Sequence, residues 1–242
     1  MRLDLATWQE VDAYLKKSDA IIIPSGSTEQ HGPMGLIGTE ALCAQQIARE
    51  AGDRAGVYVA PTLAYTPAPF NMSFPGTISI SEPVYASLVI EILQGLVHHG
   101  FRNIYFLNGH GANLAPLKRV TAEFPEVNIR IKSWWDFEAV NVLRQDHYGD
   151  WEGMHATPSE VAITQATYRT LPPGDAELPP EKLSMEFIRD HSGDRHGPPD
   201  EHRAQFPDGR VGSHSALASA GVGQEIIDAA VAALAEDVLK PG

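Results

Sequence analysis

Residues Pro24–Glu40 read PSGSTEQHGPMGLIGTE and begin where the apolar run Ala20–Pro24 ends. A second glycine-rich loop, NGHGAN at Asn108–Asn113, follows the apolar run Asn103–Leu107 in the same way. Both loops carry side chains that can bind a metal, and the end of a buried strand can hold such ligands rigidly beside solvent. The two loops therefore indicate a metal-dependent site on an α/β sheet.

Working outward from these loops, short runs rich in Ile, Val, Tyr and Phe alternate with helical patterns. The predicted strands are Ala20–Pro24, Val57–Leu63, Asn103–Leu107 and Val127–Ser133. The predicted helices are Glu40–Ala51, Glu82–His99, Asn113–Phe124, Asp136–Tyr148, Ser159–Thr170 and Gly223–Leu239, after an amphipathic helix at the N-terminus. This alternation predicts helices on both faces of a mostly parallel sheet. We expect one domain over 1–242, in which the polar, irregular segment 181–212 is a lid, an arm or a subunit contact.

The composition excludes several classes of function. The chain has 242 residues, of which 43% are apolar and 20% charged, as in a globular rather than a disordered protein. Its net charge of −13 repels polyphosphate, so we expect no nucleic-acid partner. Because no apolar run approaches the roughly 20 residues that span a bilayer, we expect no membrane segment. A single cysteine and the absence of a signal-like apolar block favour a cytoplasmic location.

Five side chains are candidate metal ligands. Glu29 and His31 are two positions apart, so an extended backbone points them to the same side. Glu40 follows Thr39, a possible helix N-cap, and could enter the site from a first helical turn. His110 lies between two glycines that leave room beside its imidazole. The fifth, Glu160, begins a predicted helix.

Each candidate alone has an ordinary alternative. Glu29 and His31 could be solvated surface residues, and Glu40 could be only a first-turn carboxylate that the helix dipole favours. His110 could stabilise its turn, and Glu160 could cap a helix. The combination favours a metal site, because strand-end loops of an α/β sheet converge in space.

The charges of these residues favour two cations over one. Glu29, Glu40 and Glu160 bring three negative charges, whereas His31 and His110 bind as neutral ligands. Two divalent cations with one bridging hydroxide give a neutral cluster, and a single cation leaves it negative. Mixed imidazole and carboxylate ligands suit zinc, manganese or iron better than calcium.

These motifs resemble those of the creatininase (creatinine amidohydrolase) family. Residues 26–40, GSTEQHGPMGLIGTE, are similar to the family signature GSTEQHGPxLPLGTD, and NGHGAN is similar to NGHGGN. The stretch FPGT at 74–77 and the glycine-rich tail at 209–223 extend the resemblance over nearly the whole chain.

The resemblance implies a three-layer αβα sandwich with a dinuclear metal centre, in which residue 40 bridges the metals. Creatininase itself has a glutamate where this chain has Ala112, so we assign the missing carboxylate to Glu160. Trp151 and His155 match a Trp-Asp-x-x-His element that holds substrate and transfers protons, with Glu152 replacing its Asp. Zinc is the expected metal, with manganese or iron as alternatives, and the expected assembly is a homo-oligomer, such as a hexamer.

The expected function is hydrolysis of a C–N bond in a small amide, cyclic amide or formamide by water that two metals activate. His155 would give a proton to the leaving nitrogen, and Trp151 would close one wall of the pocket or pack in the core. Three alternatives stay open. They are a catalytically silent metal- or ligand-binding homologue, a peptidase acting on a modified peptide, and a serine hydrolase that uses Ser25 or Ser27.

Overall fold

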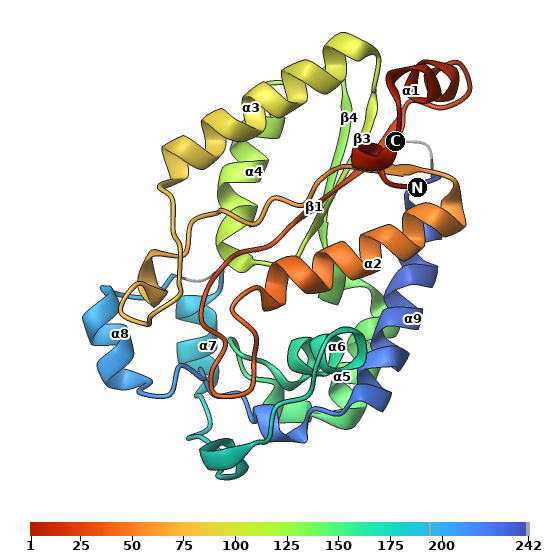
Figure 1. The fold of residues 1–242 in the computed structure, drawn as a ribbon. Coiled ribbons are helices and arrows are strands. Elements are labelled where there is room, and N and C mark those ends of the chain that lie inside the picture. The colour runs from red at the N-terminus through yellow and green to blue at the C-terminus, as the bar shows by residue number, and fades with distance from the viewer. Residues whose placement is uncertain (194, 241–242) are drawn as a thin grey trace.

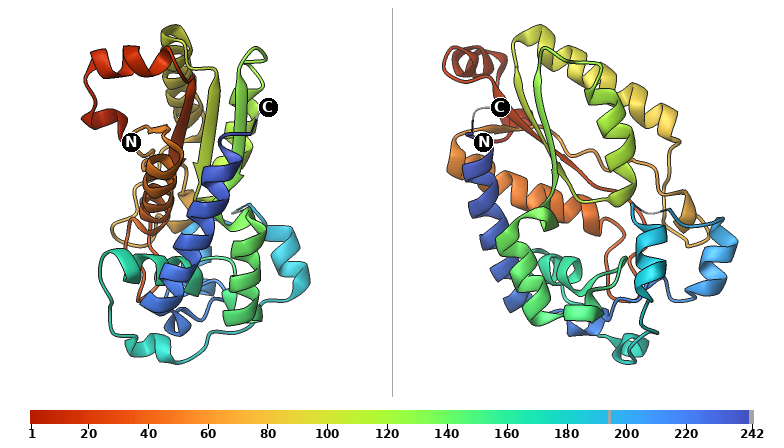
Figure 2. Two further views of the ribbon diagram at one scale, coloured as in Figure 1. Left: turned by 90° about the vertical axis from the view of Figure 1, so that its right-hand side faces the viewer. Right: turned by 180° about the vertical axis from the view of Figure 1, so that it is seen from behind.

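The computed structural model describes residues 1–193 and 195–240. Within this part of the chain, four parallel strands form one sheet in the order β2-β1-β3-β4, and helices cover both of its faces (Figures 1 and 2). The strands are β1 (Ala20–Ser25), β2 (Tyr58–Val59), β3 (Asn103–Asn108) and β4 (Asn128–Ser133). This architecture confirms the predicted αβα sandwich.

The helices include each of those predicted, with bounds that shift at the ends. They are α1 (Trp8–Leu15), α2 (Thr39–Ala55), α3 (Glu82–His99), α4 (Leu114–Thr121), α5 (Glu138–His147), α6 (Pro158–Thr167), α7 (Met185–His191), α8 (Pro199–Gln205) and α9 (Ala220–Asp237). The prediction that Thr39 caps α2 is wrong. Gly38 is the N-cap, and Thr39 lies in the first turn, where its hydroxyl donates to the carbonyl of Leu36.

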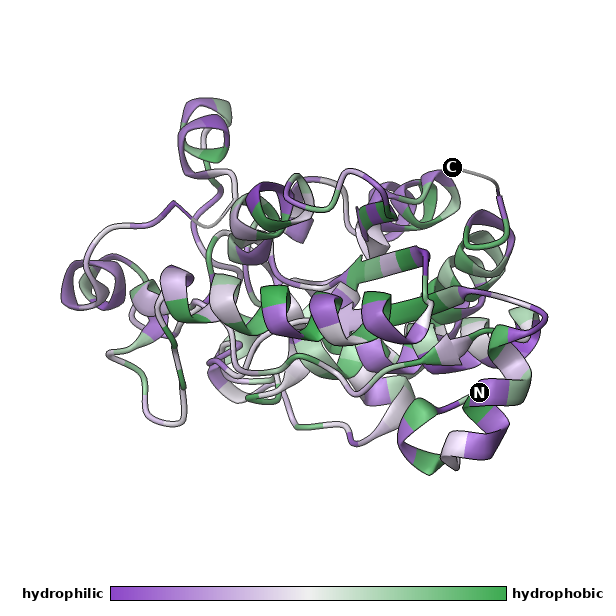
Figure 3. Cartoon of the chain, turned by 90° about the horizontal axis from the view of Figure 1, so that it is seen from above, coloured by the Kyte–Doolittle hydropathy of each residue, from purple (hydrophilic) through white to green (hydrophobic). Residues whose placement is uncertain are grey.

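The strands send alternate side chains into two hydrophobic cores, one on each face of the sheet. On β1, Ile22 belongs to the core that α2 and α9 cover. Its neighbours Ile21 and Ile23 belong to the other core, which includes Tyr85 of α3 and Leu117 of α4. Full burial of one such isoleucine stabilises the fold by about 1.5–3 kcal/mol. In Figure 3 the long helices alternate between hydrophobic and hydrophilic segments, as expected for helices that pack one face on the sheet.

The second strand is shorter than predicted. The sequence predicts a strand over Val57–Leu63, but β2 contains only Tyr58 and Val59. Pro61 has no N–H to donate to a neighbouring strand and therefore interrupts the pairing. Contact with β1 resumes at Leu63, whose N–H donates to the carbonyl of Pro24 at 2.9 Å.

The segment 181–212, predicted to be irregular, contains the two short helices α7 and α8. Its second helix lies against the loop that contains Phe70. The ring of His202 packs edge-on against that of Phe70, and Arg203 donates to the carbonyl of Ser73. The role of this segment as a lid or a subunit contact stays a prediction. Among residues 1–193 and 195–240, no helix has the length and apolar character needed to cross a bilayer.

Candidate metal centre

The carboxyl ends of β1 and β3 define the location of the candidate site. These two strands are neighbours, and their last residues, Ser25 and Asn108, are paired in the sheet. From β1 the sheet continues to β2 on one side and to β3 on the other. The loops that leave the strands at such a switch point diverge, and the crevice between them is where open α/β sheets bind ligands.

Two glycines let these loops pack tightly against the start of α2. A Cβ on Gly26 would lie 2.3 Å from the backbone nitrogen of Ala41, and one on Gly109 would lie 2.6 Å from the carbonyl oxygen of Glu40. Asn108 fixes the second loop, because its side-chain amide donates to the carbonyl of His110 at 2.8 Å. The loops thereby place Glu40 directly beside His110.

We expect the substitution Gly109→Ala to move the first turn of α2 away from the strand ends. The added methyl group would contact backbone atoms, which cannot rotate aside, so the loss of stability should be about 1–3 kcal/mol. Urea unfolding should show this loss, and metal content per chain should fall.

Gly56→Ala is the matched control for a substituted glycine, because a Cβ added there meets no atom within 4 Å. It should lower stability through its left-handed backbone alone and leave metal content unchanged. A Gly109→Ala protein with unchanged metal content and stability would contradict this packing.

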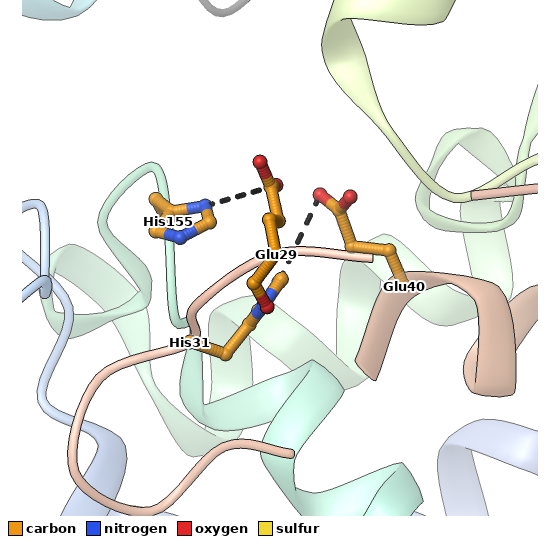
Figure 4. Close-up of side chains that lie close together, drawn as sticks. All are labelled: Glu29, His31, Glu40 and His155. Atoms are coloured by element: carbon orange, nitrogen blue, oxygen red, sulfur yellow. Dashed lines mark hydrogen bonds and ion pairs between the residues drawn. The ribbon is translucent and has the colours of Figure 1, made fainter. Parts of the chain in front are cut away.

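Four buried side chains from three parts of the chain meet at this crevice. Glu29, His31, Glu40 and His155 each offer one ligand atom, and these atoms lie within 4.8 Å of one another. Figure 4 shows the four side chains turned toward a common point, with His155 next to Glu29 and His31 next to Glu40. All four are buried, and buried carboxylates are rare in proteins unless they are paired or bind a metal.

His110 and Glu160 extend the cluster on either side of Glu40. The Nδ1 atom of His110 lies 2.7 Å from Oε2 of Glu40 and 3.3 Å from Oε1 of Glu29. The Nε2 atom of His31 lies 3.9 Å from Oε1 of Glu40 and 3.8 Å from Oε2 of Glu160. Glu40 thus turns one oxygen toward each histidine, which is the arrangement that a bridging carboxylate requires.

Backbone carbonyls hold all three imidazoles in a defined orientation. His110 bonds through Nε2 to the carbonyl of Pro67 at 2.7 Å, and His155 bonds through Nε2 to the carbonyl of Gln30 at 2.7 Å. His31 bonds through Nδ1 to the carbonyl of Glu29 at 3.1 Å. A carbonyl accepts, so these ring nitrogens carry the protons, and the opposite nitrogens, which face the carboxylates, can bind a cation. This is how proteins orient histidine ligands.

Glu160 belongs both to a helix cap and to the cluster. Its Oε1 accepts from the backbone N–H of Thr157 at 2.5 Å, in the capping box that begins α6. Its Oε2 is the atom that faces His31. Ala156, with φ of 57°, is the one residue other than glycine with positive φ among those described, and it turns the chain between His155 and this cap. Such a conformation is costly and tends to occur at functional sites.

Burial and mutual charge set the protonation of the cluster. Burial and the charge on Glu40 raise the pKa of Glu160 well above its usual range. Burial also raises the pKa of Glu40. The opposite effect is larger and holds that pKa below its usual value; it comes from His110, His31 and the hydroxyl of Ser27. Burial lowers the pKa of His31, and it lowers the pKa of His155 well below the usual range, aided by the neighbouring His31. Burial thus favours the neutral form of His31 and of His155, which is the form that binds a metal.

The donor set fits divalent metal ions. Ligands at about 2.0–2.2 Å from a tetrahedral cation lie roughly 3.3 Å apart, and the separations of 2.7–3.9 Å around Glu40 lie on both sides of that value. The Nε2 atom of His31 is buried without a hydrogen-bond partner in the described residues. A bound cation would satisfy this nitrogen and offset the three buried carboxylates.

Trp151 is placed differently from the other predicted site residues. The Nζ atom of Lys182 lies 4.6 Å from its ring centre, and the ring of His214 packs against it. It does not appear among the described residues that line the cavity beside Glu40 and Glu160. Its role as a pocket wall stays a prediction that this arrangement does not support.

Two cavities meet next to the cluster. The smaller, of about 210 Å³, is lined by Glu40, Gly111, Trp134, Trp135, Arg144, Gly153, Met154, Thr157, Ser159, Glu160, Ser192 and Gly193. A groove of about 950 Å³ shares Gly111, Ser192 and Gly193 with it and includes Ala112. Ala112, which stands where creatininase has a glutamate, thus lines the groove.

The sequence interpretation missed Asn71. Its side-chain amide donates to Oε2 of Glu29 at 3.0 Å and lies 3.3 Å from Nε2 of His155, and the residue is fully buried. Asn71 therefore orients the carboxylate of Glu29 and lies beside the ring of His155. In the sequence, a single asparagine between Phe70 and Met72 gives only a weak indication of a site residue.

The sequence interpretation also missed Arg144, which lines the smaller cavity. It lies 16 positions before Glu160 along the chain, outside every motif.

The two serines of the alternative hydrolase do not form a nucleophile–base pair. The hydroxyl of Ser27 donates to Glu40, and that of Ser25 bonds to the hydroxyl of Tyr85 at 2.9 Å. Among the described residues, neither serine is hydrogen-bonded to a histidine. The arrangement therefore does not support a serine hydrolase.

The fold and the cluster together define an αβα protein with a candidate metal centre at the sheet's switch point. The family model for creatininase (creatinine amidohydrolase) matches residues 4–238. The chain therefore belongs to the creatininase family, as its motifs predict.

Curated relatives match over part of their length. The chain is 32% identical to 3-dehydro-scyllo-inosose hydrolase of Thermotoga maritima over 106 residues, which are 43% of this chain and 34% of that protein. It is 34% identical to the mycofactocin precursor peptide peptidase of Mycobacterium tuberculosis over 112 residues, 42% of this chain and 44% of the relative. The matched region thus spans less than half of each relative.

Solved structures match over nearly the whole chain. A manganese form of creatininase has a TM-score of 0.76 at 23% identity, and the match covers 98% of this chain and 96% of the creatininase chain. A putative creatinine amidohydrolase from Bacteroides fragilis has a TM-score of 0.76 at 21% identity, covering 98% and 94%. At these identities the likeness establishes a common fold.

Proposed function

We propose that the protein is a metal-dependent hydrolase that cleaves a C–N bond in a small amide, cyclic amide or formamide. The observation that carries this proposal is the position of Glu40, with one oxygen facing His31 and the other facing His110. Glu29 and His110 would hold one divalent ion, His31 and Glu160 the other, and Glu40 both. Zinc fits this donor set best, with manganese or iron as alternatives.

The remaining chemistry follows from the residues around this centre. Bound divalent ions polarise a carbonyl and lower the pKa of a coordinated water toward neutrality. His155 has its Nε2–H committed to the carbonyl of Gln30, so Nδ1 is the atom that can take up a proton and deliver it to the leaving nitrogen. Glu29, with an oxygen 3.8 Å from this Nδ1, would stabilise the charged imidazolium.

Metal removal tests this function directly. Exhaustive chelation should abolish hydrolysis across a panel of cyclic amides, formamides and short amides, because the cluster would lose its electrophile. Zn²⁺ or Mn²⁺, but not Ca²⁺, should restore turnover. Metal content per chain, measured by mass spectrometry, should be close to two in the restored protein. Full activity in a protein verified as metal-free would contradict the proposal.

A peptidase acting on a modified peptide is a second candidate. One relative carries the name of a peptide peptidase, and the groove of about 950 Å³ beside the cavity could accommodate a longer substrate. Mass spectrometry of a peptide library after incubation would distinguish this activity from hydrolysis of small amides. Two bound metals without turnover of any amide or peptide would favour the silent homologue instead.

We further propose that the protein is a homo-oligomer, such as a hexamer, in the cytoplasm. Support for association comes from apolar side chains that are exposed in the single chain, among them Trp8 at 75% and Met185 at 80%. Light scattering of the purified protein would give its mass in solution.

A further inference from the structure

An arginine lines the cavity beside the cluster. Arg144 of α5 shares this cavity with Glu40 and Glu160 and with the indoles of Trp134 and Trp135. Glu40 and Glu160 are the carboxylates that line this cavity, and Arg144 is the one cationic side chain among the described residues of its lining. A negatively charged group that enters the cavity would therefore meet Arg144.

Two neighbours hold the guanidinium of Arg144 in place. Its Nε donates to Oε1 of Glu152 at 2.9 Å, and its Nη1 donates to Oδ1 of Asn141 at 3.0 Å. The guanidinium carbon also lies 5.9 Å from the centre of the Trp134 ring. The side chain is only 20% exposed, so little rotamer entropy remains to be lost when it binds a ligand.

The hydrogen bonds of Arg144 leave the end of its fork available. An arginine that only neutralised Glu152 would be expected to bond both carboxylate oxygens. Here a single bond joins Nε to Oε1, and Oε2 of Glu152 is buried without a hydrogen-bond partner in the described residues. The remaining N–H donors of Arg144, on Nη1 and Nη2, form a planar pair that matches the two oxygens of a carboxylate.

The network also connects Arg144 to the cluster. Oε1 of Glu152 accepts from the hydroxyl of Ser159, which lies 3.1 Å from the hydroxyl of Thr157. Thr157 in turn holds Glu160 through the capping box. Hydrogen bonds thus fix the position of the guanidinium relative to a candidate metal ligand, as a specificity-determining residue requires.

We propose that Arg144 binds a carboxylate group of the substrate, so that the enzyme acts on carboxylate-bearing amides in preference to neutral ones. This inference rests on the proposed function, because it places the scissile C–N bond at the cluster in the same cavity. Glu152 already offsets part of the charge on Arg144, so the preference should be moderate, about tenfold or about 1.4 kcal/mol.

Binding of hydroxamates tests the inference without turnover. A hydroxamate group chelates divalent metals, and three probes that differ at the far end of a two-carbon chain isolate the role of Arg144. They are the monohydroxamate of succinic acid, its carboxamide analogue and butyrohydroxamate. Titration calorimetry on the zinc-loaded protein should give affinities in the order carboxylate, carboxamide, methyl, with about tenfold between first and last.

The variant Arg144→Lys keeps a cation for Glu152 but loses the fork, so it should fold and reduce the tenfold preference to below about threefold. Arg169→Lys, at an exposed position, is the matched control and should retain the full preference. Equal affinity for all three probes in the unmodified protein, or an undiminished preference in Arg144→Lys, would overturn the inference while metal-dependent binding persists. Failure of every hydroxamate to bind the metal-loaded protein would overturn the proposed function, and this inference with it.

Discussion

Replacing Glu40 by glutamine should remove at least one of two bound metals and lower turnover about a thousandfold or more. The carboxylate of Glu40 faces His110 with one oxygen and His31 with the other. A glutamine amide has only one oxygen, and its NH₂ group would point at one of the two cations. Loss of several kcal/mol of charge stabilisation at the reacting carbonyl corresponds to a rate loss of this size.

Metal content by mass spectrometry and turnover of the same Glu40→Gln sample measure the two effects together. Glu40→Asp keeps two acceptor oxygens and restores the residue of the family signature, so it should retain both metals and part of the activity. Glu50→Gln, in a later turn of α2, controls for loss of a carboxylate on that helix and should change neither. Two tightly bound metals in Glu40→Gln would show that this residue does not bridge them.

The second large effect is expected for His155→Gln. If His155 carries a proton to the leaving nitrogen, turnover should fall about a hundredfold to ten-thousandfold while metal content stays constant. The amide of glutamine can take the place of Nε2 and still donate to the carbonyl of Gln30, so the loop should keep its position, but it cannot take up a proton.

The opposite outcome for His155→Gln has an equally definite meaning. His155 belongs to the group of four residues whose ligand atoms lie within 4.8 Å of one another, so a metal-binding role would appear as loss of metal together with loss of turnover. Parallel metal analysis and kinetics separate the two roles. His147→Gln, at a surface histidine beside Glu225, is the control and should behave as the unmodified protein.

The parts of the site that could be predicted from sequence are those encoded within a few residues. Glu29 and His31 share a short loop, and Glu40 begins the helix after it, so a strand–loop–helix pattern is enough to bring them near one another. Glu160 was assigned through the missing carboxylate at Ala112, and the structure places its Oε2 near His31. The alternation of strands and helices likewise sufficed for the sandwich.

The parts that could not be predicted depend on contacts between distant segments. Asn71 reaches Glu29 across 42 positions, and nothing local to residue 71 indicates that contact. The position of Trp151 beside Lys182 depends on how the segment 181–212 packs, which polar composition does not specify. Arg144 becomes conspicuous only when the lining of the cavity is known.

Glu160 has a consequence for how this protein can change over time. One of its oxygens starts a helix and the other completes a charged cluster. A substitution there would disturb architecture and reactivity in a single step, so neither could be adjusted independently. Any evolutionary route to a new activity is thus more accessible through the residues that surround this carboxylate than through the carboxylate itself.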